Sequence, residues 1–166
     1  MYQSISEFVA DWQNESQASQ KLFDALSDDS LNQKVYEGGR SLGKIAWHIV
    51  QTLPEMNGQA GLELDKGVMK EDVPVQASTI SENYKKLANQ LIEEIQNKWT
   101  DDKLSEVIEV YGEQWSRSKV LEVFIRHEIH HRAQLTVLMR QAGLKVPGLY
   151  GPSQEEWVNY GVPAQA

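Results

Sequence analysis

The sequence predicts an all-α protein, specifically a four-helix bundle, and two observations support this prediction. Four long segments repeat apolar residues at the three- and four-residue spacing of an amphipathic helix. Polar, turn-rich stretches separate these segments. A bundle is the commonest way to bury four apolar stripes against one another. Because the 166 residues contain no internal repeat or interdomain linker, we expect a single domain over residues 1–166.

The first helix is predicted from Ser4 or Ser6 to about Leu26, with apolar residues along one face. Polar or small residues interrupt the middle of this face. The simpler interpretation is that they contact a neighbouring backbone or water, and the alternative is that they line a cavity. These residues are Glu15, Ser16 and Ser19.

The second helix should begin after Ser41, because serine is a favourable N-cap residue. Pro54 lies inside the helical pattern and predicts a kink there. The third helix should begin at Ser78 or Ser81 and continue to Trp99. It has the cleanest amphipathic pattern in the chain and carries no candidate chemistry.

An irregular linker precedes the fourth helix, with a helical turn or a short extended piece expected at residues 107–111. Ser116 or Ser118 should cap the fourth helix, and Gly143 follows it in the position of a C-terminal stop. The proline-rich tail should cross the surface and include a short helical turn at residues 153–157.

Composition excludes several classes of function. The chain has no cysteine, which rules out disulfides, thiolate metal sites and cysteine nucleophiles. The net charge of -8 argues against nucleic acid as a partner, since phosphate binding needs a basic surface. No apolar run is long enough to cross a bilayer, and the acidic N-terminal segment is unlike a secretory signal. We therefore expect a soluble, cytoplasmic protein that binds neither membranes nor nucleic acid.

The histidines are the candidate functional residues. His127, His130 and His131 lie in the fourth helical segment, and His48 lies in the second. Positions four apart are about 40° apart around a helix, so His127 and His131 are neighbours on one face. The helical wheel places this pair inside the apolar stripe together with Gln134, whereas His130 lies at the edge, about 60° from His127. His48 lies at the border of the apolar stripe of its own helix.

The remaining charged residues of the fourth helix should point away from this stripe. The wheel directs Glu128, Arg132 and Arg140 toward solvent or toward flanking elements. The apolar stripe itself should consist of Val120, Val123, Phe124, Leu135, Leu138 and Ala142.

Two chemical interpretations of the histidines follow. If His48 meets His127 and His131, three imidazoles would bind a metal ion and leave one position open, which is typical of a catalytic site. Such ligation suits zinc, nickel, copper or iron. Alternatively, the histidines only form ordinary hydrogen bonds. Candidates for hydrogen bonds to the ligands of a metal site are Glu15, Glu128 and Gln134, although each could equally be a solvated or structural polar residue. The aromatic residues that could form the walls of its pocket, or simply pack in the core, are Trp12, Trp47, Tyr111 and Trp115.

Residues 127–131 also satisfy the pattern H-E-x-x-H, in which Glu128 would be the base of a zinc protease. This interpretation is less favoured. A further histidine is available on another helix, and the chain has no sheet edge along which a peptide could bind.

The sequence resembles the DinB/YfiT-like family of metalloenzymes over nearly its whole length. The resemblance is carried by AWHIV with His48, by HEIHHRAQL with His127 and His131, and by the tail VPGLYGPSQEEW. It implies a four-helix bundle, often dimeric, in which those three histidines hold a divalent metal ion and His130 lies beside the site. Ala133 stands where many members have glycine, and the residue is still small.

Characterised members of that family are thiol-dependent S-transferases or isomerases that use bacillithiol, mycothiol or glutathione. The resemblance therefore implies a metal-dependent S-transferase with zinc or nickel, a small-molecule substrate, a low-molecular-weight thiol as co-substrate, and a homodimer. The alternative is a non-catalytic, dimeric bundle of the stress-response type that binds metal incidentally.

Overall fold

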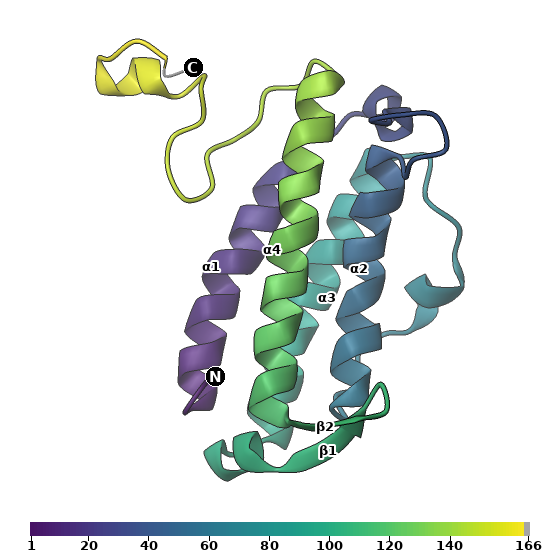
Figure 1. Cartoon of the computed structure of the whole chain (residues 1–166), viewed down its shortest axis with the longest axis vertical. Helices are drawn as coiled ribbons and strands as arrows, with labels where there is room; N and C mark the ends of the chain where they lie inside the picture. The colour runs from purple at the N-terminus through teal and green to yellow at the C-terminus, as the bar shows by residue number, and fades with distance from the viewer. Residues whose placement is uncertain (165–166) are drawn as a thin grey trace.

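The computed structural model describes residues 1–164 and confirms the four-helix bundle (Figure 1). The four helices run side by side along the long axis of the molecule. Helix α4 packs chiefly against α2, α1 packs against α3, and α2 also packs against α3. The helices are α1 (Ile5–Asp24), α2 (Leu42–Gln59), α3 (Ala77–Lys98) and α4 (Arg117–Gln141).

Short elements connect these helices and extend the C-terminal tail. They are the 3-10 helices η1 (Asp28–Asn32), η2 (Gly67–Lys70), η3 (Asp101–Ser105) and η4 (Trp157–Tyr160), and the strands β1 (Val107–Val110) and β2 (Glu113–Ser116). The two strands form an antiparallel hairpin at the end of the bundle where α4 begins (Figure 1).

Serine caps start three of the four helices. The side chains of Ser4, Ser41 and Ser116 each accept a hydrogen bond from the backbone N–H three residues later, as the sequence predicts. Helix α3 begins at Ala77, earlier than predicted, because its N-terminus is capped from outside the helix. The Ala77 N–H donates to a carboxylate oxygen of Asp28 in η1, at 2.7 Å.

Two local features predicted from the sequence were an extended piece at residues 107–111 and a helix that contains Pro54. The extended piece at residues 107–111 is confirmed as strand β1, although its partner β2 was not anticipated. Tyr111 and Gly112 form the two-residue turn between the strands, and both have positive φ angles, 54° and 80°. The helix α2 continues through the buried Pro54 to Gln59.

The core lies along the axis of the bundle and contains large side chains from all four helices. On α1, the Trp12 indole N–H donates to the Ala88 carbonyl at 3.0 Å, and its ring packs against Phe124 with centroids 5.0 Å apart. Other fully buried aromatic residues are Phe8, Phe23, Trp47 and Tyr84.

The buried face of α4 is rotated relative to the predicted stripe. Glu128 and Arg132, expected outside the apolar stripe and directed toward solvent or flanking elements, are each only 1% exposed. His127 and His131, expected inside the core, are only partly buried, and so are two of the predicted stripe residues, Val123 and Ala142. The prediction was wrong because a helical wheel treats charge as a sign of exposure, and here both charged residues have buried polar partners on other helices.

The tail leaves the end of α4, passes the C-terminal end of α1 and then extends away from the bundle (Figure 1). The helical turn expected at residues 153–157 is present but displaced, because a turn at 154–156 leads into η4. Within residues 1–164, no helix has the length and apolar character needed to span a membrane.

Candidate metal centre

The structure brings together the three histidines singled out by the sequence. His48 lies on α2, and His127 and His131 lie one turn apart on the face of α4 that packs against α2. The Nε2 atom of His127 lies 3.3 Å from Nε2 of His48 and 3.1 Å from Nε2 of His131. The three residues each offer a ring nitrogen, and these nitrogens all lie within 4.8 Å of one another.

These distances fit a metal ion. Two ligands of a tetrahedral ion with metal–nitrogen bonds of about 2.0–2.1 Å lie roughly 3.3 Å apart. Three neutral imidazoles cannot all hydrogen-bond to one another through Nε2, because His127 Nε2 can donate only one proton. A shared cation would use the lone pairs of all three atoms at once. The three histidines could therefore hold a metal ion.

The electrostatic environment keeps the imidazoles neutral at physiological pH. Burial, with smaller contributions from the charges of His131 and Arg40, lowers the pKa of His48 from 6.5 to about 4. Burial lowers the pKa of His127 to about 4 in the same way, and it lowers the pKa of His131 as well. Since only a neutral imidazole binds a metal ion, the site is ready for ligation without first losing protons.

Gln134 orients one of the three rings. Its side-chain oxygen lies 2.8 Å from Nδ1 of His131, so this nitrogen carries the proton and Nε2 keeps its lone pair. The Gln134 amide also donates to Nε2 of His130 at 3.2 Å. Gln134 therefore has the supporting role expected from the sequence, and His130 lies beside the cluster without joining it. Nδ1 of His127 has no hydrogen-bond partner in the described part of the chain.

Glu128 does not belong to the histidine cluster. Its carboxylate accepts hydrogen bonds from Ser19 on α1, at 2.6 Å, and from the hydroxyl of Tyr84 on α3. Burial raises the pKa of Glu128 to about 7, against the opposing effects of these two hydrogen bonds and of the Arg132 charge. A carboxylate held in the core by α1 and α3 is poorly placed to act as the base of an H-E-x-x-H protease.

A buried ion pair lies next to this carboxylate. Arg132 contacts the carboxylate of Glu15 and donates to the Glu15 carbonyl at 2.7 Å and to the Ser19 hydroxyl at 3.3 Å. Tyr150 of the tail donates to the same carboxylate at 2.6 Å. The polar interruption of α1 is thus matched by the polar residues of α4. Glu15 contacts α4 and the tail, and it does not support the histidines directly.

Two hollows flank the histidine cluster, and both are lined by Arg40. We name the first the Arg40 cavity. It has a volume of about 430 Å³ and is lined in part by Val35, Tyr36, Arg40, His131, Val137 and Leu138. The second, of about 270 Å³, is lined in part by Arg40, Lys44, Trp47, His48, Glu71 and Asp72.

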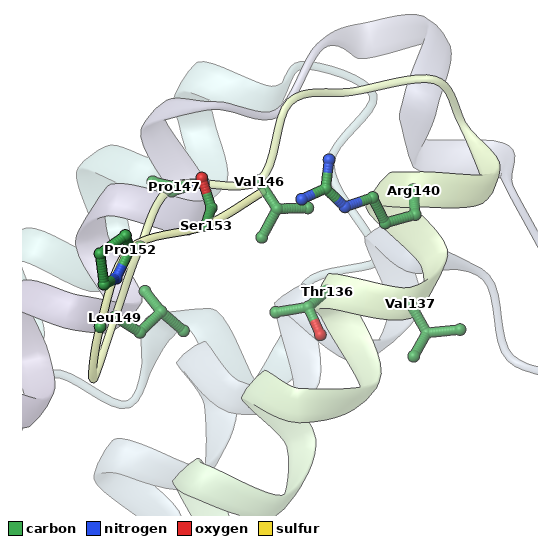
Figure 2. A pocket seen from close by; sticks show the side chains of 10 residues that line it. Thr136, Val137, Arg140, Val146, Pro147, Leu149, Pro152 and Ser153 are labelled. Carbon is green, nitrogen blue, oxygen red and sulfur yellow. The ribbon is translucent and has the colours of Figure 1, made fainter. Parts of the chain in front are cut away.

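Of the four aromatic residues proposed as pocket walls, only Trp47 has that position. It lines the hollow beside His48, and its indole N–H donates to the Glu71 carbonyl at 3.2 Å. Trp12 is a core residue, and Tyr111 and Trp115 contact each other in the hairpin. A third hollow, of about 350 Å³, lies between the end of α4 and the tail, with Thr136 on the side of α4 and Val146 and Leu149 on the side of the tail (Figure 2). The histidines do not line it.

Comparison with known proteins assigns the fold and the family. The model of the DinB family matches residues 1–164. The chain belongs to the DinB family. The uncharacterized protein YrdA of Bacillus subtilis (strain 168) is 38% identical over 164 residues, which cover 99% of this chain and 98% of YrdA.

Solved structures of DinB-like proteins have the same architecture. One, from Bacillus cereus ATCC 10987, is 40% identical, with a TM-score of 0.85 over 90% of this chain and 100% of that protein. Another, YjoA of Bacillus subtilis, has a TM-score of 0.68 over 86% of this chain and 97% of YjoA. Because YjoA is only 18% identical, it supports the fold alone. The resemblance inferred from the sequence motifs is therefore confirmed at the level of family and fold.

Proposed function

We propose that His48, His127 and His131 bind one divalent metal ion, zinc or nickel, and that the protein is a metal-dependent thiol S-transferase. The convergence of three Nε2 atoms, with separations of 3.3 and 3.1 Å, is the observation that carries this proposal. All-imidazole ligation suits both metals.

The proposed centre has the composition of a catalytic site. Three protein ligands leave a coordination position open, whereas structural metal sites are closed by a fourth protein ligand. A metal ion held by these histidines would lower the pKa of a thiol or water bound at the open position toward neutrality. Open hollows beside His131 and His48 give a small molecule access to this position.

Thiol transfer is the reaction that this site and the family resemblance support best. The chain has no cysteine, so the sulfur must come from a small-molecule thiol. In the reaction, the thiol releases its proton to water and its sulfur forms a bond to an electrophilic carbon. The bond from that carbon to the leaving group breaks, and the leaving group departs with the electron pair. Gln134 contributes by holding the His131 ring with Nε2 directed at the shared site.

A conjugation assay tests this function. Protein loaded with zinc or nickel should accelerate the reaction of bacillithiol or glutathione with monochlorobimane, which becomes fluorescent as chloride is displaced. His127→Ala should abolish the acceleration, whereas His130→Ala, a matched change outside the cluster, should retain it. Metal-loaded protein that accelerates conjugation of neither thiol would contradict the S-transferase and favour a non-catalytic bundle.

A further inference from the structure

Among the residues that the structure describes, Arg40 is the arginine whose side chain has no polar partner. The other four arginines each form an ion pair with a carboxylate: Arg117 with Glu106, Arg126 with Glu122, Arg132 with Glu15 and Arg140 with Glu155. Within residues 1–164, Arg40 forms neither an ion pair nor a hydrogen bond through its side chain, although acidic residues outnumber basic ones by 24 to 16. An unpaired guanidinium in an acidic protein is available to an external anion.

The chain holds Arg40 at the histidine cluster. Arg40 immediately precedes Ser41, the N-cap of α2, and its loop is closed at the base by a β-bridge between Lys34 and Ser41. The Leu42 N–H also donates to the Gln33 carbonyl at 2.8 Å, across the same base. Burial is the main cause of the lowered pKa of the three clustered histidines, and the charge of Arg40 contributes at each of them.

The two hollows that share Arg40 differ in charge. The hollow beside His48 also contains Lys44 and the two acidic residues Glu71 and Asp72, so its charges balance. Of the described residues that line the Arg40 cavity, Arg40 alone has a charged side chain, and most of the others are apolar. An anion is therefore favoured in the Arg40 cavity.

The apolar lining of this cavity is unusually exposed. Val35, Tyr36 and Val137 are 58%, 69% and 53% exposed, and all three line the Arg40 cavity together with the buried Leu138. Its volume of about 430 Å³ lies within the range typical of small-molecule sites. Exposed apolar side chains around one cation match a ligand with an apolar body and one anionic group.

We propose that Arg40 binds a carboxylate of the substrate, and that the site takes small carboxylic acids whose apolar part occupies the Arg40 cavity. This inference rests on the proposed function, because it assigns the substrate class of the same site. The guanidinium presents a planar fork of N–H donors that matches the two oxygens of a carboxylate. His131 lines the same cavity, so a ligand anchored on Arg40 extends toward the histidine cluster.

Calorimetric titration of metal-free protein with 4-phenylbutyrate and its neutral amide tests the anchor. The acid should bind about tenfold more tightly than the amide, as expected for a hydrogen bond to a charged group. Arg40→Gln should remove this difference by weakening acid binding, and it should leave amide binding unchanged. Lys34→Gln, which removes an equal charge from the same loop outside the cavity, should retain the preference.

Three results would overturn this inference. The first is that the acid and the amide bind equally well or do not bind at all. The second is that Lys34→Gln weakens acid binding as much as Arg40→Gln does. The third is that 3-phenylpropyl phosphate binds more tightly than the carboxylate. Metal binding is measured on the same preparations. Normal metal binding without an acid preference would contradict this inference alone, whereas an Arg40-dependent acid preference in a protein that binds no metal would contradict the proposed function.

Discussion

The Nε2 atoms of His48 and His127 lie 3.3 Å apart, although 79 positions separate the two residues in the sequence. Contact between α2 and α4 brings them together, and neither helix alone has more than two of the three clustered histidines. The centre is therefore a product of the bundle, so folding and metal binding should stabilise each other.

Acidification should destabilise the metal-free protein between about pH 6.5 and pH 4. In the folded state His48 and His127 take up protons only near pH 4, whereas in the unfolded chain histidine does so near 6.5. Between these values the unfolded chain binds more protons, so the free energy of unfolding falls as the pH is lowered. Urea denaturation at a series of pH values, with chelator present, measures the slope.

The His48→Ala/His127→Ala variant is the control for this slope. Its free energy of unfolding should depend less steeply on pH in the same window, because both imidazoles are missing. A residual slope should remain, since the carboxylates that also titrate there are unchanged. An identical slope in the variant and in the wild type would show that these two imidazoles are not the cause.

Gln134→Leu should weaken metal binding by roughly tenfold, because loss of a hydrogen bond to a ligating histidine typically costs ten- to a hundredfold in affinity. The change removes the acceptor for Nδ1 of His131 and leaves the three imidazoles in place. Competition with a chromophoric chelator measures the affinity. His130→Ala, which removes the other partner of Gln134, should have little effect, and a comparable loss would argue against orientation of His131.

Arg132→Met should destabilise the protein by about 3 kcal/mol or more, because it leaves the buried carboxylate of Glu15 without its cationic partner. The double variant Arg132→Met/Glu15→Leu should recover part of this loss, since no unpaired charge remains. Urea denaturation provides both values. If the loss of stability in the double variant equals the sum of the losses in Arg132→Met and Glu15→Leu alone, the two side chains are not coupled.

Glu128→Gln should change metal affinity by no more than about twofold, because its carboxylate is bonded to Ser19 and Tyr84 and ligates nothing in the histidine cluster. Stability is the property that should respond, since the amide replaces a carboxyl group in a buried network. The H-E-x-x-H interpretation makes a different prediction, namely loss of amide hydrolysis with the metal retained. Detectable peptide hydrolysis that disappears in Glu128→Gln would revive that interpretation.

Apolar periodicity and capping residues were sufficient to predict the four helices. Ser4, Ser41 and Ser116 cap their helices as expected, because an N-cap depends on local geometry. The start of α3 depends on Asp28, a residue from another element, and so a local pattern could not place it.

The histidine cluster was predictable in part. The spacing of His127 and His131 placed them on one face, and His48 on the second helix was the candidate for a third imidazole. The family resemblance then implied the same three residues as ligands. The burial of Glu128 and Arg132 was missed, because it depends on partners from another helix. The polar residues Glu15 and Ser19 inside the apolar face of the first helix could have indicated this burial, because buried polar residues need polar partners on a neighbouring helix.

The position of Arg40 could not be inferred from the sequence. It lies in a connecting loop with no periodic pattern, and its place beside the histidines follows from the closure of that loop against the start of α2. The homodimer implied by the family resemblance stays a prediction.

Calorimetric titration of metal-free protein with zinc or nickel tests the central claim most directly. The wild type should bind one metal ion per chain, and the His127→Ala/His131→Ala variant, with two of the three imidazoles removed, should lose this binding while remaining folded by circular dichroism. Unchanged stoichiometry and affinity in the folded double variant would show that the metal binds elsewhere and would contradict the proposed centre.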